Sequence, residues 1–139
     1  MLPLNTPAKQ TVAGKRIYVL EDNLDNRIVL RMALIGAILE FDRWGRDTMK
    51  HLKQFAPVDL IILDLMLPAG VTGYSVFEEI RADKTFTKIP IIAFSASEPS
   101  VAIPKCQHLG FSGFIPKPMG DNFAEQIMKA ISGEKIWQF

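Results

Sequence analysis

The sequence has almost no cysteine, no long apolar segment and no large excess of charge of either sign. Cys106 is the single cysteine among 139 residues. An internal disulfide and a zinc site built from cysteines are therefore excluded, which fits a reducing cytoplasm. No apolar run reaches the roughly 18 residues needed to span a bilayer, and residues 1–14 lack the continuous apolar core of a secretion signal. We expect a cytoplasmic protein without a membrane anchor, in which residues 1–14 form a flexible tail.

The charge balance and length argue for an ordinary globular domain. The formal net charge is +1, so no general field attracts nucleic acid or a membrane surface. Apolar residues make up 48% and charged residues 22%, which is typical of soluble folded proteins. A chain of this length fits one domain with a real core. The sequence predicts a domain over residues 15–133, followed by a short C-terminal tail at 134–139, with no nucleic-acid partner.

Apolar runs alternate with amphipathic stretches along the chain, separated by short turns that contain Gly, Pro and Asp. This order is typical of a doubly wound α/β domain with a parallel sheet. The run at 58–63 is nearly all apolar, which indicates a central strand covered on both faces, whereas the alternation at 38–44 indicates an exposed edge. The pattern predicts five strands, near residues 17–20, 38–44, 58–63, 89–94 and 113–116, together with about five helices.

Helical spacing is clearest after the first strand. The segment 24–35 has apolar residues that recur at helical intervals, namely Leu24, Ile28, Met32 and Ile35. Similar spacing predicts helices over 73–82 and 122–132. The segment 97–110 contains Pro99 and Pro104, and an interior proline costs about 3 kcal/mol. We therefore expect a short helix that begins near Pro104, after a long loop.

Polar side chains that can bind a metal or react lie at the ends of four predicted strands. Glu21 and Asp22 follow the first strand, Asp64 follows the third, and Ser95 and Lys117 end the last two. The carboxyl ends of parallel strands lie along one edge of a sheet, so we expect these residues to meet in one pocket. The structural alternative, in which each residue only caps a turn or lies at the surface, does not explain their coincidence at four strand ends.

Such a pocket suits a divalent cation and a phosphoryl group. Three neighbouring carboxylates repel one another, and at least one pKa rises unless a cation joins them. Carboxylates and waters suit Mg²⁺ better than a caged Ca²⁺. Asp64 is the natural nucleophile, because a carboxylate can accept a phosphoryl group as an acyl phosphate. Lys117, held between two prolines, and the Ser95 hydroxyl would offset the charge during transfer.

Several short motifs together resemble the receiver domain of two-component response regulators. The resemblance covers residues 15–132 and implies a flavodoxin-like, doubly wound five-stranded parallel sheet of order 2-1-3-4-5, with helices on both faces. The motifs that carry it are Glu21-Asp22-Asn23, Leu63-Asp64-Leu65-Met66-Leu67-Pro68, Gly73-Tyr74, Ser95-Ala96 and Lys117-Pro118.

The resemblance also implies a role for each matched residue. Asp64 would be phosphorylated by a histidine of a sensor kinase or of a phosphotransfer protein. Glu21, Asp22, Asp64 and the backbone carbonyl of Met66 would hold Mg²⁺, for which Mn²⁺ can substitute. Lys117 would contact the phosphoryl group, and the Lys117–Pro118 peptide would be cis.

The expected switch residues are Ser95 and Phe114. Phe114 stands where tyrosine is common in the family, so its ring can turn toward Ser95 but carries no hydroxyl. The turn at 68–73 is one residue longer than usual and lacks the usual aspartate, so this loop can sit differently beside the site. Met66 borders the path of the attacking water and cannot orient it by hydrogen bonding, which predicts a phosphoryl-aspartate that hydrolyses slowly.

The leading hypothesis is a stand-alone phosphoacceptor, since only residues 133–139 follow the last predicted helix. It would signal through an unidentified downstream protein or within a phosphorelay, and a homodimer is left open. We expect no turnover enzyme beyond self-catalysed phosphorylation and dephosphorylation. The alternatives are a receiver fold that works unphosphorylated, a flavodoxin-like carrier, whose flavin phosphate Glu21 and Asp22 would repel, and a small Mg²⁺-dependent phosphatase. The phosphatase needs an acid where Met66 stands.

Overall fold

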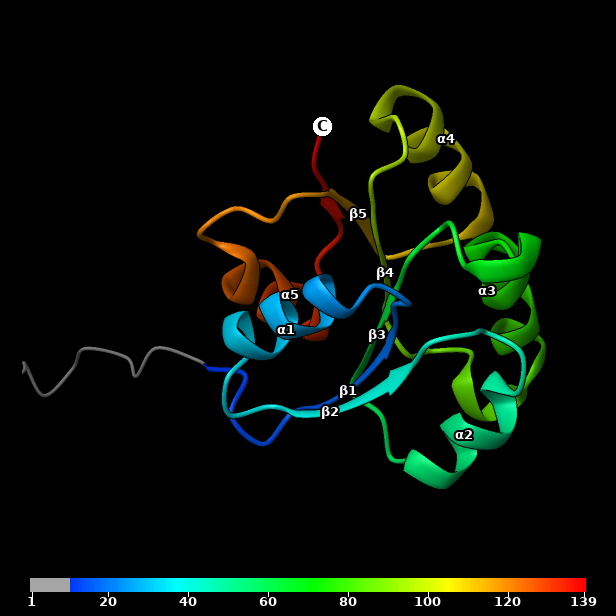
Figure 1. Ribbon diagram of the computed structural model, residues 1–139, viewed down its shortest axis with the longest axis horizontal. Helices are drawn as coiled ribbons and strands as arrows, with labels where there is room; N and C mark the ends of the chain where they lie inside the picture. The colour runs from blue at the N-terminus through cyan, green and yellow to red at the C-terminus, as the bar shows by residue number, and fades with distance from the viewer. Residues whose placement is uncertain (1–10) are drawn as a thin grey trace, which may run out of the picture.

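The computed structural model describes residues 11–139. It contains a six-stranded parallel sheet with helices on both faces (Figure 1). The apolar runs become strands, and the amphipathic stretches between them become helices. In chain order the elements are β1 (Arg16–Leu20), α1 (Leu24–Ala33), β2 (Ile38–Asp42), α2 (Thr48–Phe55), β3 (Leu60–Leu63), a 3₁₀ turn η1 (Pro68–Gly70), α3 (Gly73–Ala82), a second 3₁₀ turn η2 (Lys84–Phe86), β4 (Ile91–Ser95), α4 (Pro99–Leu109), β5 (Gly113–Pro116), α5 (Phe123–Ile131) and β6 (Ile136–Trp137).

The strands follow the order β2-β1-β3-β4-β5-β6, and all neighbours are parallel. The expected order of the first five strands is therefore confirmed. The sixth strand was not expected, because it comes from residues 134–139, which were predicted to form a tail. All four residues of β3 are buried, as predicted for the centre of a parallel sheet.

Two hydrophobic clusters fill the space between the sheet and its helices. Helices α1 and α5 cover one face, and α2, α3 and α4 cover the other (Figure 1). Strand β1 shows how alternation serves both clusters: Ile17 and Val19 pack toward α1 and α5, whereas Tyr18 and Leu20 pack toward the opposite helices. This arrangement leaves the carboxyl edge of the sheet free of helices.

The strand register brings the strand ends to a common level. Leu20 pairs with Asp42 on one side and Leu63 on the other. The same row continues through Ala93 and Phe114 to Trp137. Residues that follow this row therefore emerge together at the carboxyl edge, as the sequence predicted.

The predicted apolar row of the first helix lies at the surface. The sheet-facing side of α1 carries Leu30 and Leu34, which are fully buried. The segment thus has two apolar sides, of which one is covered by the sheet and one is exposed. The exposed fractions of the other row lie between 47% and 81%, for Leu24, Ile28, Met32 and Ile35.

Helix α4 differs from its prediction. It begins at Pro99, five residues before the expected start, and Pro104 lies inside it. Pro99 occupies the first turn, where a missing N–H costs nothing. The cost of Pro104 is about 3 kcal/mol, and burial of Ile103 and Cys106 against the core offsets it at about 1.5–3 kcal/mol for a large apolar side chain. The prediction of a short helix starting at Pro104 is therefore wrong.

Both ends of the described chain contact the domain. Val12 is buried, and the Gly14 N–H donates to the Gly36 carbonyl at 2.9 Å, so residues 11–14 pack on the domain. The predicted flexibility of residues 1–10 lies outside the described residues. Trp137 of β6 packs against the core, whereas Phe139 is exposed. Between residues 11 and 139 no helix combines the length and apolar character required to cross a bilayer.

Candidate functional site

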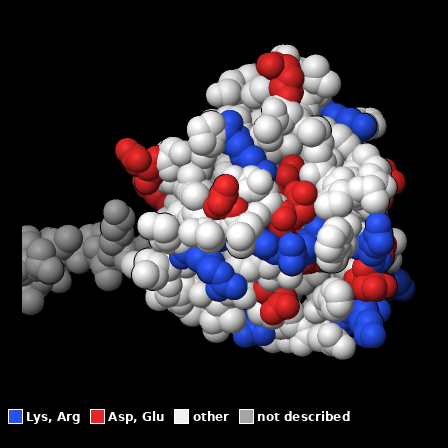
Figure 2. All heavy atoms as spheres, in the orientation of Figure 1, with Lys and Arg blue, Asp and Glu red and all other residues white. Residues whose placement is uncertain are grey.

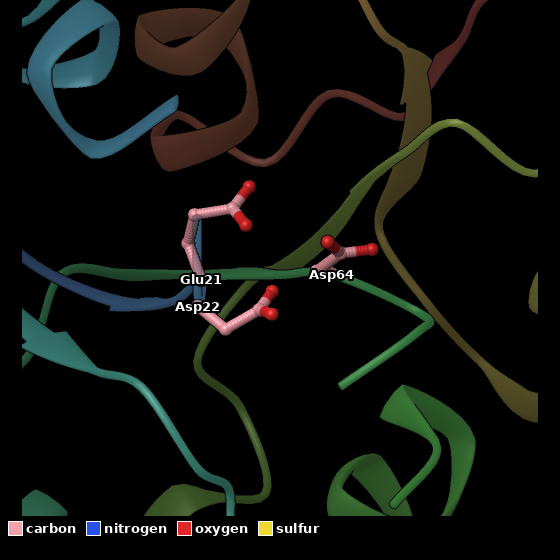
Figure 3. Close-up of side chains that lie close together, drawn as sticks. All are labelled: Glu21, Asp22 and Asp64. Carbon is pink, nitrogen blue, oxygen red and sulfur yellow. The ribbon is translucent and has the colours of Figure 1, made fainter. Parts of the chain in front are cut away.

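Strands β1 and β3 position an acidic cluster at the carboxyl edge. The Asp64 N–H donates to the Leu20 carbonyl at 3.0 Å, and the Glu21 N–H donates to the Asp42 carbonyl at 3.0 Å, so the sheet ladder extends to the acids. Carboxylate oxygens of Glu21, Asp22 and Asp64 lie within 4.8 Å of one another. All three carboxylates project into the same space beside the strand ends (Figure 3).

Backbone N–H groups orient two of the acids, Glu21 at the turn into α1 and Asp64 after β3. Asn23 caps the helix, because its side-chain oxygen accepts from the Asn26 N–H at 2.9 Å. Glu21 Oε2 in turn accepts from the Asn23 N–H at 3.2 Å. On the other strand, Asp64 Oδ1 accepts from the Met66 N–H at 3.1 Å. Glu21 and Asp64 are thereby oriented by backbone donors, in addition to any ligand they bind.

Lys117 bridges two of the acids. Its Nζ lies 2.5 Å from Glu21 Oε1 and 2.8 Å from Asp64 Oδ2. The Lys117 backbone N–H donates to the Ser95 carbonyl at 3.0 Å, which ties the end of β5 to the end of β4. The Lys117–Pro118 peptide is cis, as the resemblance implied.

Burial and charge act against each other in this cluster. Burial raises the pKa of Glu21, and the charge of Asp64 adds to this, whereas Lys117 partly opposes it. Burial alone would lower the pKa of Lys117, but its hydrogen bonds to Asp64 and Glu21 outweigh burial and raise it. Lys117 pairs with two of the three clustered carboxylates and Asp22 is not among them, so negative charge remains in excess. A hard divalent cation with oxygen ligands fits such a donor set.

Ser95 and Phe114 flank the acids without contacting their oxygens. Ser95 is buried, and its Oγ lies 3.0 Å from Ser97 Oγ and accepts from the Ser97 N–H at 3.3 Å. Its recorded side-chain partner in the described chain is thus Ser97 and not Asp64. The Phe114 ring is fully buried in the cluster beneath α4. Ser95 ends β4 with its hydroxyl turned to its own loop, and Phe114 lies within β5, where it pairs with Ala93 of β4.

Gly73 supports the site in a way that sequence reasoning missed. A Cβ at this position would lie 2.3 Å from the Asp64 carbonyl oxygen and 2.7 Å from Leu65 Cα. The Gly73 N–H also donates to the Leu65 carbonyl at 2.9 Å. Only glycine therefore lets the start of α3 approach the backbone of Asp64 so closely. The residue was noted as part of a motif, but its close approach is visible only in three dimensions.

A second buried acid, Asp42, stands at the end of β2 and was also missed. It accepts hydrogen bonds from the Tyr18 hydroxyl at 2.7 Å and the Thr48 hydroxyl at 2.8 Å. The backbone N–H groups of Trp44 and Gly45 donate to it at 3.1 and 2.9 Å. Burial raises the pKa of Asp42, but these donors outweigh burial and lower it. Asp42 is therefore a satisfied structural acid, and its hydrogen-bond partners are visible only in the structure.

The surface around the site has no broad field of one sign. Acidic and basic side chains are interspersed over the face shown in Figure 2, in agreement with the small net charge. The excess negative charge is local to the acidic cluster.

Known proteins are similar to this chain in sequence and fold. Residues 17–132 match the response regulator receiver domain family. The two-component response regulator ARR3 of Arabidopsis thaliana is 30% identical over 117 residues, which cover 74% of this chain and 49% of ARR3. The chain thus spans about half the length of that relative.

Two solved structures are informative about such sites. The receiver domain of sensor histidine kinase PA1611 from Pseudomonas aeruginosa, which has a magnesium ion in its active-site cleft, is 27% identical with a TM-score of 0.75. That alignment covers 87% of this chain and 100% of the other. The phosphorylated cyanobacterial phytochrome response regulator RcpA is 30% identical with a TM-score of 0.69, over 86% of this chain and 92% of RcpA.

Proposed function

This chain belongs to the response regulator receiver family, and we propose that its domain at 15–133 accepts a phosphoryl group on Asp64 from a phosphohistidine. Receiver domains partner with histidine kinases in two-component systems, so the donor is a sensor histidine kinase or a histidine phosphotransfer protein. The observation that carries the proposal is the cluster of three carboxylates within 4.8 Å of one another, two of which, Glu21 and Asp64, share Lys117.

The acidic cluster is the proposed Mg²⁺ site. Glu21, Asp22 and Asp64, with the backbone carbonyl of Met66, would hold the ion, and Mn²⁺ would replace it with the same oxygen ligands. The bound ion supplies positive charge to the phosphoryl oxygens. Support comes from the surplus of negative charge over Lys117 and from the magnesium ion in the PA1611 receiver domain.

The chain's own residues then carry out a single displacement. A carboxylate oxygen of Asp64 forms a bond to phosphorus as the phosphorus–nitrogen bond of the phosphohistidine breaks, and the electron pair leaves with the imidazole nitrogen. Lys117, 2.8 Å from Asp64 Oδ2, opposes the negative charge on the transferred group. The Ser95 hydroxyl turns from Ser97 to a phosphoryl oxygen, and Phe114 follows it. The phosphorylated state of RcpA supports this chemistry.

The exposed apolar row of α1 supports a protein donor. The row consists of Leu24, Ile28, Met32 and Ile35, and it begins two residues after Asp22. Contiguous exposed apolar side chains mark protein-binding surfaces. A helical partner that covers this row would bring a histidine to the neighbouring acidic cluster.

The phosphorylated form is proposed to be long-lived. Met66 is exposed beside Asp64, and its thioether cannot orient an attacking water as a strong hydrogen-bonding group would. We expect slow hydrolysis in purified protein with Mg²⁺. A half-life of seconds would contradict this part of the proposal.

The decisive test is incubation with acetyl phosphate and Mg²⁺, followed by intact-mass measurement. The wild type is expected to gain one phosphate, and Asp64→Asn to gain none. A wild type that gains no phosphate, or an Asp64→Asn variant that gains as much as the wild type, would overturn the proposed function.

A further inference from the structure

The edge of β5 is covered by β6, the short strand formed by the C-terminal residues. Gly113 pairs with Ile136, and Phe114 pairs with Trp137. The Ile136 N–H donates to the Ser112 carbonyl, and the Gln138 N–H donates to the Phe114 carbonyl, both at 3.0 Å. Without β6, these carbonyl groups would form an open sheet edge that another chain could pair with.

The attachment of β6 is shaped by particular residues. A Cβ on Gly113 would lie 2.1 Å from the Ile136 carbonyl oxygen, so only glycine allows this close approach. Trp137 packs against the hydrophobic cluster that contains Phe114. Phe139, two residues further on, is 83% exposed and pairs with no strand. The contact therefore involves β6 specifically and not the whole C-terminal segment.

The attachment is also small and carries an unpaired polar atom. It rests on the pairs at Ile136 and Trp137 and on the bond from Gln126 Nε2 to Gln138 Oε1 at 2.5 Å. Gln126 Oε1 is buried without a partner among the described residues. Flipping the Gln126 amide would only exchange which of its polar atoms is unpaired. A buried unpaired group is costly, so this polar atom adds nothing to the attachment.

Phe114 connects β6 to the phosphorylation site. Its carbonyl accepts from Gln138, its ring belongs to the cluster on which Trp137 packs, and its strand partner in β4 is Ala93. Ser95, at the end of β4, and Lys117, just after β5, are joined by a backbone hydrogen bond. When the Ser95 hydroxyl turns toward a phosphoryl group on Asp64, the ring of Phe114 can move after it. Such a movement would change the packing surface of Trp137, which pairs with Phe114 in the sheet and packs on the same cluster.

We propose that β6 is a detachable cover of the β5 edge and that phosphorylation of Asp64 weakens its attachment. This inference rests on the proposed function, because the signal that it reads is the phosphoryl group. Release uncovers the backbone of β5 for another extended segment. By reciprocity, loss of the β6 contact favours the phosphorylated state by the same factor.

Hydrogen exchange tests the release directly in the wild-type protein. Mg²⁺ with beryllofluoride, a stable mimic of a phosphoryl group on a carboxylate, provides the equilibrium probe. The amides of Ile136 and Gln138 are expected to exchange about 5-fold faster or more when the probe is bound. In a Trp44→Phe background, which leaves Trp137 as the only tryptophan, acrylamide quenching should increase in parallel. Unchanged exchange and quenching at saturation with the probe would overturn the inference.

A pair of variants tests the reciprocal effect. Trp137→Ala removes the aromatic side chain that packs on the core and should bind beryllofluoride about 5-fold tighter or more. Phe139→Ala removes an exposed aromatic side chain two residues after Trp137 and should bind beryllofluoride as the wild type does. Equal affinity in Trp137→Ala and wild type would overturn the coupling. A wild type that gains no phosphate from acetyl phosphate contradicts the proposed function itself. If the wild type is phosphorylated normally but β6 stays attached, only the proposal that β6 detaches is contradicted.

Discussion

Two buried acids at the ends of the strands on either side of β1, Asp42 and Asp64, have opposite surroundings. Asp42 is the last residue of the edge strand β2 and accepts four hydrogen bonds from hydroxyl and backbone donors. Asp64 follows β3 and faces two other carboxylates, with Lys117 shared between it and Glu21. Both acids are less than one-tenth exposed, so burial does not distinguish them.

The pKa values of Asp42 and of Glu21 shift in opposite directions. The donors around Asp42 lower its pKa despite burial, whereas burial and the neighbouring acid raise the pKa of Glu21 beside Asp64. A carboxylate whose lone pairs are satisfied by the protein stabilises the fold. A cluster of carboxylates with too few donors is left to bind a cation and to react. The number of hydrogen-bond donors around each acid therefore distinguishes the structural acid Asp42 from the acids of the proposed reactive site.

The largest expected effect comes from removing the Lys117 ammonium, which Glu21 and Asp64 share. Lys117→Met should slow phosphorylation by acetyl phosphate about 100-fold, since a lost charge-stabilising donor typically costs this much. The rate of mass gain measures the effect, with Lys50→Met, which removes an exposed lysine of α2, as the control. A Lys117→Met rate within about 2-fold of the wild-type rate, far less than the expected loss, would show that the reaction of Asp64 does not depend on the Lys117 ammonium.

Breaking the satisfied site should instead cost stability. Asp42→Asn is expected to lower the free energy of unfolding by about 2 kcal/mol, because hydrogen bonds to a charged group are lost, and to leave phosphorylation in place. The folded-state pKa of Asp42 is lowered, so its contribution is present above the ordinary aspartate pKa of about 3.9 and disappears as the pH falls through the folded value.

Denaturant unfolding at several pH values measures this prediction. The difference between wild type and Asp42→Asn should be full near neutral pH and shrink in acid. Asp47→Asn, at an exposed acid with no side-chain cap bond, is the matched control and should behave as the wild type. A pH-independent difference would mean that the charge of Asp42 is not what stabilises the loop.

A steric change should weaken the reactive site without altering its charges. Gly73→Ala places a Cβ against the Asp64 carbonyl, so the backbone must shift, and we expect phosphorylation to slow about 10-fold. Gly120→Ala is the control, since its Cβ would lie 3.4 Å from the Asn122 side chain. Equal rates for Gly73→Ala and wild type would show that the position of Asp64 tolerates displacement.

The smallest effect separates chemistry from docking. Ile28→Glu, on the exposed row of α1, should slow transfer from a sensor kinase that phosphorylates the wild type by about 5-fold or more, with no change in the reaction with acetyl phosphate. Val101→Glu makes the same kind of change on α4, where the side chain is also exposed, and should leave both rates unchanged. Equal slowing with both donors would place Ile28 in folding or chemistry instead.

Features carried by strand ends were predictable from the sequence. The alternation of apolar runs and helical stretches predicted a parallel sheet, because each run is bounded by turn residues. The strand order was implied by the resemblance to receiver domains. The positions of Glu21, Asp64, Ser95 and Lys117 followed from the rule that parallel strands end at one edge.

Features decided by packing were not predictable. Pro104 is tolerated inside α4 because Ile103 and Cys106 are buried around it, which local propensity does not reveal. Strand β6 is two residues long and exists because Gly113 admits it. The structural role of Asp42 was not predicted, because the donors that converge on it come together only in the folded protein.

The most direct measurement is peptide mass mapping of the phosphorylated wild type after treatment with acetyl phosphate, with Mg²⁺ or with a chelator. The phosphate is expected on the peptide that contains Asp64 and only when Mg²⁺ is present. Phosphate on the peptide that contains Asp42, or equal yield in the presence of the chelator, would contradict the assignment of the cation-dependent reactive site to the unsatisfied acids.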